Sequence, residues 1–261
     1  MMAQPSGWAD ILRYRYLLLN LVATELKVKY RGSALGFLWS LLNPLALILI
    51  YSIAFRYIVR IQIDRYAVFL IAGLLPWGFF ASSATASTIS LMVNATLLKK
   101  VYFPREIIPA STVLFNLTQM LLALAVFLPS LLVLHSHLPW TLVFYPVVLG
   151  LQVLFVIGVA MALSALTVVF RDLRHLTEVG LTMLFWLTPI VYSLSMVPAR
   201  LRVVFALNPM AAFVSAYQEI AYWGRPPGAG AFLAMAGWAA GALVVGWTIF
   251  RRRAPYVAED L

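Results

Sequence analysis

Cysteine is absent from this 261-residue sequence, and acidic residues and histidine are scarce. The missing thiols exclude a disulfide framework and any metal site built on cysteine. The nine Asp and Glu residues are scattered over predicted loops and tails, and there are three His. A hydrolase or transferase would need a carboxylate pair, a Ser/His/Asp set or a metal cluster. The sequence therefore predicts neither catalytic nor metal-binding residues.

Charge of either sign is missing from six long stretches. They are Ser33–Phe55, Tyr66–Leu98, Ile107–Pro139, Trp140–Phe170, Val179–Ala199 and Pro226–Phe250. A helix of about 20 residues crosses the hydrocarbon layer of a bilayer, and each stretch is long enough. The sequence is 63% hydrophobic, with a mean hydropathy of +0.93, far from the composition of a soluble domain. We predict an all-α integral membrane protein with six transmembrane helices.

Signals for energy coupling are also lacking. Proton or ion coupling normally requires ionisable residues inside the spans, and the six stretches contain no Asp, Glu, Lys or Arg. A phosphate-cradling loop would place a Lys after Gly and before Ser or Thr, and none of the four lysines has these neighbours. We therefore predict a conduit that binds no cofactor and is driven by another chain.

The net charge of +10 would suggest nucleic-acid binding in a soluble protein. Here its distribution gives a different interpretation. Thirteen of the nineteen Lys and Arg residues fall in predicted cytoplasmic segments and six in predicted outer segments. This asymmetry favours a multi-pass protein with both termini in the cytoplasm. The basic residues are then mostly anchors and contacts for anionic lipids, and no nucleic-acid partner is expected.

The chain divides into three predicted regions. Residues 1–32 form a cytoplasmic amphipathic helix, 33–250 the six-helix transmembrane domain, and 251–261 a cytoplasmic tail. Within the domain, residues 94–106 form an inner loop, and 195–228 an outer segment of re-entrant or interfacial helices. The apolar face of the amphipathic helix is formed by Trp8, Leu12, Leu19, Val22 and Leu26. It is either a simple anchor or an interface helix beside a cytoplasmic entrance.

Proline and glycine predict local features within the spans. A kink is expected at Asn43-Pro44 and a break at Pro76, because proline removes a helical hydrogen bond. Gly237 and Gly241 have the small-xxx-small spacing that allows close helix packing. No secretory signal is expected, since residues 1–7 lack positive charge and Arg13 interrupts the first apolar run.

Aromatic residues are frequent at membrane depth and at the membrane edges. One interpretation is the aromatic belt found at both interfaces of membrane proteins. The other is a pathway lined by flat rings that stack against sugars. The candidates for such a lining are Phe37, Trp39, Tyr51, Trp77, Phe80, Phe185 and Trp186.

Several motifs, in their order and spacing, resemble one known family over nearly the whole chain. These are Leu26–Pro44, Phe103–Glu106, Phe170–His175, Trp186–Tyr192 and Leu207–Pro209. They are similar to the ABC-2 type permeases of polysaccharide exporters, the Wzm and TagG group that exports O-antigen and teichoic acid.

The resemblance implies a half-transporter of the bacterial inner membrane that forms a homodimer. Two copies of a Wzt-like ATPase subunit would bind ATP and Mg²⁺. The cargo would be a polysaccharide on undecaprenyl pyrophosphate, exported through a tunnel at the dimer interface. Residues 94–106 would contain the coupling helix, placed at Leu98–Arg105, and 195–228 the outer gate helices.

The resemblance also implies roles for basic residues. Lys27, Lys29 and Arg31 would lie where a lipid pyrophosphate approaches, and Lys and Arg suit phosphate oxygens. The alternative for these three residues is ordinary anchoring at the cytoplasmic surface. Coupling to the ATPase would involve Lys99, Lys100, Tyr102 and Arg105.

Two alternatives remain open at this point. One is an ABC-2 permease for another cargo, such as a drug, a lipid, a capsule polymer or teichoic acid. The other is a membrane channel or scaffold that is not driven by ATP. The inner loop at Leu98–Arg105 separates these classes, because only an ATP-driven permease needs a docking element for an ATPase there.

Overall fold

The computed structural model describes residues 13–32, 38–135 and 139–253. In these ranges every regular element is a helix. The longer ones are α2 (Arg15–Tyr30), α3 (Leu38–Tyr51), α4 (Tyr66–Val93), α6 (Ile107–His135), α7 (Tyr145–Val169), α8 (Leu173–Trp186), α10 (Pro209–Ala221) and α11 (Ala229–Arg253). The shorter ones are η1 (Ser52–Ile58), α5 (Ala95–Lys100), η2 (Trp140–Phe144), η3 (Leu194–Met196), η4 (Ala199–Leu201) and α9 (Arg202–Ala206).

Four helical segments of the described chain are long and apolar enough to span a membrane. These are Tyr66–Val93, Ile107–Phe127, Trp140–Val169 and Ala229–Arg253. A fifth candidate is a bent pair, Ala199–Ala206 and Pro209–Ala221, whose axes meet at 104°. The predicted all-α membrane fold is therefore confirmed. The number of six spans, and the re-entrant nature of the outer pair, remain predictions.

The two other predicted spans are shorter helices. In the first, α3 is followed directly by the π-helix η1, and Leu45–Ile58 is a short apolar segment. In the fifth, the 14 residues of α8 rise about 21 Å, at 1.5 Å per residue. The helix ends at Trp186, close to the end that Thr188-Pro189 predicts for this span. Pro189 explains the end, because a residue before proline is disfavoured in the helical conformation.

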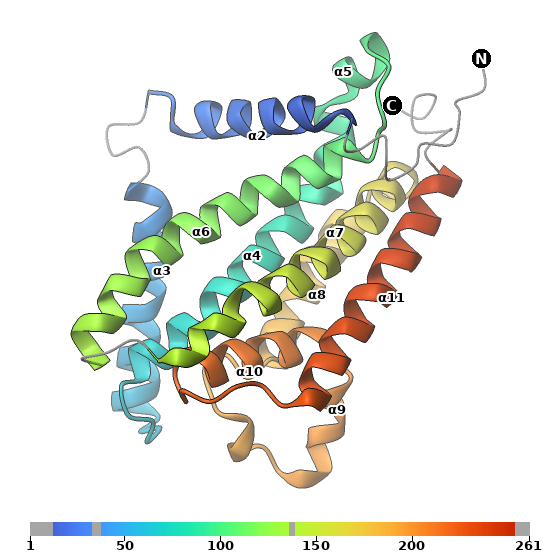
Figure 1. Cartoon of the computed structure of the whole chain (residues 1–261). Coiled ribbons are helices and arrows are strands. Elements are labelled where there is room, and N and C mark those ends of the chain that lie inside the picture. The colour runs from blue at the N-terminus through green and yellow to red at the C-terminus, as the bar shows by residue number, and fades with distance from the viewer. Residues whose placement is uncertain (1–12, 33–37, 136–138, 254–261) are drawn as a thin grey trace.

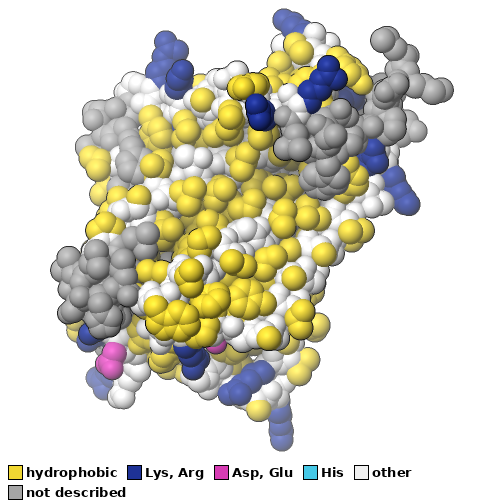
Figure 2. All heavy atoms as spheres, in the orientation of Figure 1, with side chains coloured by type: hydrophobic (Ala, Val, Ile, Leu, Met, Phe, Trp, Pro, Cys, Tyr) yellow, Lys and Arg dark blue, Asp and Glu magenta, His cyan; other side chains and the backbone are white. Residues whose placement is uncertain are grey.

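The long helices run between two ends of the molecule (Figure 1). Helix α2 lies across one end, over α6, and α5 projects at that same end, which we call the inner end. Helices α9 and α10 lie at the opposite, outer end. On the face in Figure 2, hydrophobic side chains cover the middle and Lys and Arg side chains gather toward the two ends. This distribution matches a protein that crosses a membrane along its long helices.

Helix α4 forms the centre of the core, and it is continuous through Pro76. The predicted break at this proline is therefore wrong. Gln152 of α7 donates a hydrogen bond to the Pro76 carbonyl at 2.9 Å, and its Oε1 accepts one from Tyr217 at 2.8 Å. These two bonds tie α4 to α7 and α10 beside the proline. Helix α3 likewise continues through Pro44.

The closest helix packing joins α7 and α11. A Cβ on Gly158 would collide with the backbone at Ala242, and one on Gly246 would collide with the carbonyl of Gly158. By contrast, a Cβ on Gly237 or Gly241 would meet nothing within 4 Å. Close packing through a glycine of the last helix is thus present, but not at the predicted pair. Small residues permit such approach because dispersion contacts between backbones replace side-chain packing.

Helix α2 packs one face against α6 and the inner end of the core. Val22 is buried, and Leu18, Leu21 and Leu26 are partly buried. Leu19, predicted on the same apolar face, is 58% exposed, so it does not take part in this packing. The predicted positions Trp8 and Leu12 lie outside the described residues. The amphipathic helix is present over Arg15–Tyr30, with its packed face rotated toward Leu18 and Leu21.

Candidate functional site

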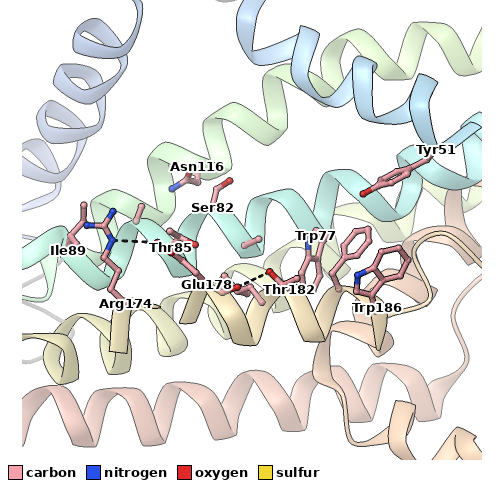
Figure 3. A pocket seen from close by; sticks show the side chains of 14 residues that line it. Tyr51, Trp77, Ser82, Thr85, Ile89, Asn116, Arg174, Glu178, Thr182 and Trp186 are labelled. Atoms are coloured by element: carbon pink, nitrogen blue, oxygen red, sulfur yellow. Dashed lines mark hydrogen bonds and ion pairs between the residues drawn. The ribbon is translucent and has the colours of Figure 1, made fainter. Parts of the chain in front are cut away.

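Two adjoining cavities form an open groove between α3, α4, α6 and α8, which we call the central groove. Figure 3 shows the larger of the two. Their volumes are about 730 and 390 Å³. Both lie in the size range of ligand pockets, about 300–1,000 Å³. The residues that line both cavities are Tyr51, Trp77, Ser82, Asn116 and Phe185.

One part of the central groove is aromatic. Tyr51 of α3 stacks on Phe185 of α8 with ring centroids 6.0 Å apart, and Trp77 of α4 meets Phe185 edge-on at 5.6 Å. Trp186 contacts Phe185 at 5.3 Å and is 53% exposed. These centroid distances suit aromatic pairs, which prefer offset or edge-to-face geometry. Four of the seven aromatic candidates are therefore brought together by three helices.

The other three candidates are placed differently. Phe80 is buried in the core, where it contacts Trp77 and Phe155, and it does not line the groove. Trp39 belongs to α3, but its side chain lies outside the described part of the structure, and Phe37 is also outside it. Whether any of the seven touches a sugar remains a prediction.

The opposite part of the groove wall is polar, and the sequence analysis missed it. Ser82 and Thr85 of α4 and Asn116 of α6 line it, together with Thr182 of α8 (Figure 3). The signal that could have found the α4 contribution is its run of small polar residues, Ala81–Ser90. These side chains carry no charge, and they offer both donors and acceptors of hydrogen bonds. Such a wall suits a neutral, hydroxyl-rich ligand.

A single ion pair lies among the lining residues of the described chain. Arg174 and Glu178 approach to 3.5 Å one turn apart on α8, and both side chains are about half exposed. An exposed pair of this kind contributes at most about 1 kcal/mol to stability. The pair therefore lies at the inner end of the groove and adds little to its rigidity.

The three basic candidates at the end of α2, Lys27, Lys29 and Arg31, are all exposed. The ammonium of Lys29 also lies 5.5 Å from the centroid of the Phe115 ring of α6. Lys29 also lines the smaller cavity of the groove. Beside it, the Tyr30 hydroxyl donates to Oε1 of Gln119 at 2.5 Å and ties α2 to α6.

Glu25 is the acidic residue of α2. Burial raises the pKa of its carboxyl group, because the charged form loses solvation.

The predicted coupling loop 94–106 contains a helix, but an earlier one than expected. Helix α5 spans Ala95–Lys100, and the backbone is extended at Val101, so the helix placed at Leu98–Arg105 is corrected. Lys99, Lys100 and Tyr102 are exposed, and Arg105 is partly buried. Phe103 is buried against Ile107, which anchors the loop to the inner end of the core.

The outer segment is tied to the end of α8 by buried amide groups. Asn208 accepts a hydrogen bond from the Met210 N–H, which caps α10, and donates to the Leu187 carbonyl and the Thr188 hydroxyl, all at 2.9 Å. Gln218 donates to the Pro189 carbonyl at 2.9 Å. The Thr188-Pro189 and Asn208-Pro209 motifs are thus two halves of one contact. A gating role for this segment remains a prediction.

Residues 16–222 match the family described as ABC-2 type transporter. The chain belongs to this family. It is 36% identical to an O-antigen export system permease protein RfbA from Myxococcus xanthus, over 97% of this chain and 98% of the relative. It is 38% identical to an RfbA from Klebsiella pneumoniae, over 78% and 79%. It is 25% identical to the polysialic acid transport protein KpsM of Escherichia coli, over 75% and 77%.

The family match covers the helices that build the central groove. It begins within α2, includes α3, α4, α6 and α8, and ends just after α10. Helix α11 lies beyond it, but falls inside the alignment with the Myxococcus relative, which covers 97% of the chain. A member of this family with four or five candidate spans is a multi-pass membrane protein. Among the described residues, no three His, Cys, Asp or Glu side chains come together in a way that could hold a metal ion.

Proposed function

We propose that this chain is the transmembrane permease subunit of an ABC exporter for an O-antigen-like polysaccharide. The observation that carries the proposal is the central groove, whose wall combines the aromatic rings of Tyr51, Trp77 and Phe185 with uncharged polar groups. Rings stack on the apolar faces of sugars, and amides and hydroxyls satisfy sugar hydroxyl groups. The names of the relatives, O-antigen export permeases, support this cargo.

The permease acts as a homodimer in which two such grooves face each other and form the tunnel. The groove is open, and its wall carries the polar residues Asn116 and Glu178 besides Leu181 and Trp186. If the protein were a monomer, these polar groups would face lipid. Polar groups at membrane depth face a protein interior or a water-filled cavity. A second copy of the chain supplies that enclosure.

Energy is supplied by two copies of a Wzt-like ATPase that bind ATP and Mg²⁺. Helix α5 and the following residues present Lys99, Lys100 and Tyr102 to the exterior at the inner end (Figure 1). Exposed cations beside an anchored aromatic loop suit docking on a partner protein. Changing Lys99 and Lys100 to Glu is expected to reduce co-purification of the ATPase at least about tenfold. Unchanged ATPase binding by the double variant would contradict this assignment.

The cargo is attached to undecaprenyl pyrophosphate, which approaches at the exposed face of α2. Lys27 and Arg31 are exposed there, and Lys29 reaches the neighbouring cavity. A guanidinium binds phosphate oxygens with two donors and an ammonium as a point charge. Lys27→Gln and Arg31→Gln should therefore slow export more than the equally exposed change Arg13→Gln.

The chain lies in the inner membrane with the inner end in the cytoplasm. That end carries Lys27, Lys99 and Lys100, and α11 finishes there with Arg251, Arg252 and Arg253. An excess of Lys and Arg favours the cytoplasmic side. Labelling of cysteines introduced at Lys100 and Arg200 from outside spheroplasts is expected only at Arg200. Labelling at Lys100 would reverse the orientation.

Deletion of the chain tests the function itself. Undecaprenyl-linked glycan should accumulate inside the cell while surface polysaccharide is lost, and the accumulated glycan would identify the cargo. Normal surface polysaccharide would overturn the proposal in favour of a permease for a drug or lipid. Loss of a capsule polymer or of teichoic acid instead of O-antigen would select the alternative of an ABC-2 permease for that cargo.

A further inference from the structure

Gln119 is a groove residue whose amide is only half satisfied by the protein. Its Oε1 accepts the hydrogen bond from Tyr30, and its Nε2 is buried without a hydrogen-bond partner. Gln119 lines the smaller cavity of the central groove. If the amide were rotated by 180°, Tyr30 would occupy Nε2 and the oxygen would be left over. In both cases one polar end of Gln119 is held in place and the other lacks a protein partner.

Asn116 lies one helical turn before Gln119 and lines both cavities. Its side chain is 8% exposed, and its Nδ2 donates to the Thr112 carbonyl of the same helix at 2.9 Å. This contact fixes the amide and leaves Oδ1 as an acceptor. Residues three apart in a helix share one face, so the two amides form a polar pair on the groove wall of α6.

The pair lies in a wall that suits a sugar ring better than an anion. Ser82 adds a hydroxyl, and Trp77 and Phe185 add rings to the same cavity. The cation that lines this smaller cavity, Lys29, lies over the Phe115 ring, a favourable contact for its charge. Amides and hydroxyls both donate and accept hydrogen bonds, as the hydroxyls of a neutral sugar do. A phosphate or carboxylate offers acceptors only.

We infer that Asn116 and Gln119 form a subsite for an uncharged pyranose unit of the polymer, with Trp77 and Phe185 as its apolar wall. Tyr30 is the positioning residue that holds the Gln119 amide. Because this inference rests on the proposed function, the polymer must be the cargo for the subsite to act. A subsite in a conduit has to bind weakly enough to release each unit, and two neutral amides fit that requirement.

The test uses Gln119→Met and Asn116→Leu, which keep the approximate size and remove the hydrogen bonds. Thr118→Val is the matched control, since Thr118 bonds its own helix at Leu114 and does not line the groove. Tyr30→Phe removes the tie to α2 but keeps the Gln119 amide. The purified permease–ATPase complex is titrated with the lipid-linked glycan that accumulates in the deletion strain, and stimulated ATP hydrolysis is measured.

Each amide variant is expected to raise the half-maximal glycan concentration about fivefold, the effect of one lost hydrogen bond, with maximal hydrolysis unchanged. Tyr30→Phe should give a smaller rise and Thr118→Val none. Unchanged half-maximal concentrations in both amide variants would overturn the subsite while leaving the proposed function intact. Equal effects of Tyr30→Phe and Gln119→Met would reduce Gln119 to a structural tie and also overturn it. If the deletion strain accumulates no lipid-linked glycan, the proposed function and the subsite fail together.

Discussion

Gln152 and Gln119 carry the same side chain on neighbouring helices, yet the structure uses them differently. Gln152 of α7 is fully buried, and both ends of its amide are hydrogen-bonded, to Pro76 and to Tyr217. Gln119 of α6 lines the central groove; it is bonded at one end, and its buried Nε2 has no hydrogen-bond partner. A buried polar group in the core is hydrogen-bonded, because leaving it without a partner costs free energy.

The outer segment follows the rule of the core. Asn208 and Gln218 are both buried, and their amide groups bond to backbone or side-chain atoms around Thr188 and Pro189. The comparison therefore separates two classes of polar residue in one membrane domain. The amides of Gln152, Asn208 and Gln218 tie helices of the fold together, whereas Gln119 lines the groove with one polar end unbonded. The predictions below change one class and leave the other intact.

The largest effect is expected from the packing of α7 on α11, which belongs entirely to the core. Gly246→Val would place side-chain atoms on the backbone of Gly158, and overpacking against backbone costs about 3 kcal/mol or more. We expect little folded protein in the membrane. Gly241→Val is the matched control, because a Cβ at Gly241 meets nothing within 4 Å. Equal amounts of the two variants in the membrane would show that the close crossing is not needed for folding.

The second prediction compares the two glutamines directly. Gln152→Met removes the bond to the Pro76 carbonyl and leaves the buried Tyr217 hydroxyl without its partner, at a cost of about 2 kcal/mol. Gln119→Met loses the Tyr30 bond, but its Nε2 has no partner to abandon, so its cost is smaller. Thermal unfolding of the two purified proteins, followed by tryptophan fluorescence, should give the lower midpoint for Gln152→Met. The reverse order would remove the distinction between core and groove.

A third, functional effect is expected at the exposed aromatic edge of the groove. Trp186 is 53% exposed and contacts Phe185, so Trp186→Ala should affect stability little and slow the appearance of surface polymer several-fold. Trp140 is 67% exposed and outside the groove, which makes Trp140→Ala a matched control. If both variants export at the wild-type rate, the rings of α8 belong to the aromatic belt.

Much of this arrangement could be predicted from the sequence. The absence of charge over long stretches predicted the membrane helices, and the motifs predicted the family. The aromatic content of the spans predicts Tyr51, Trp77, Phe185 and Trp186 as lining residues, and their rings meet in the groove.

Other features depend on contacts between distant helices, which local patterns do not contain. The helix through Pro76 is held by packing on all sides, and Gln152, far along the chain, bonds to its carbonyl. The sequence around Gly158 and Gly246 does not show that these two glycines lie where α7 and α11 cross. Asn116 and Gln119 were overlooked because neutral amides in an apolar run carry no distinctive spacing, and only the groove gives them a shared surface.

The smallest effect is expected at Glu25. The fold partly buries its carboxyl group, and burying a charged group without a partner costs free energy. Burial raises the pKa of Glu25 above its ordinary value, so ionisation is harder in the folded protein than in the unfolded chain. Below the unfolded pKa both states are protonated and no penalty exists. As the pH rises through the folded pKa, the carboxylate destabilises the packing of α2.

Glu25→Gln should therefore raise the unfolding midpoint by a degree or two at pH 8 and leave it unchanged near pH 4. Asp172→Asn, a change at an exposed acid in the turn before α8, serves as the control and should give no gain at either pH. A gain for Glu25→Gln that is as large at pH 4 as at pH 8 would assign the effect to packing rather than to charge. The stability of the packing between α2 and α6 would then depend on shape, as at the α7–α11 crossing, and not on the cost of a buried carboxylate.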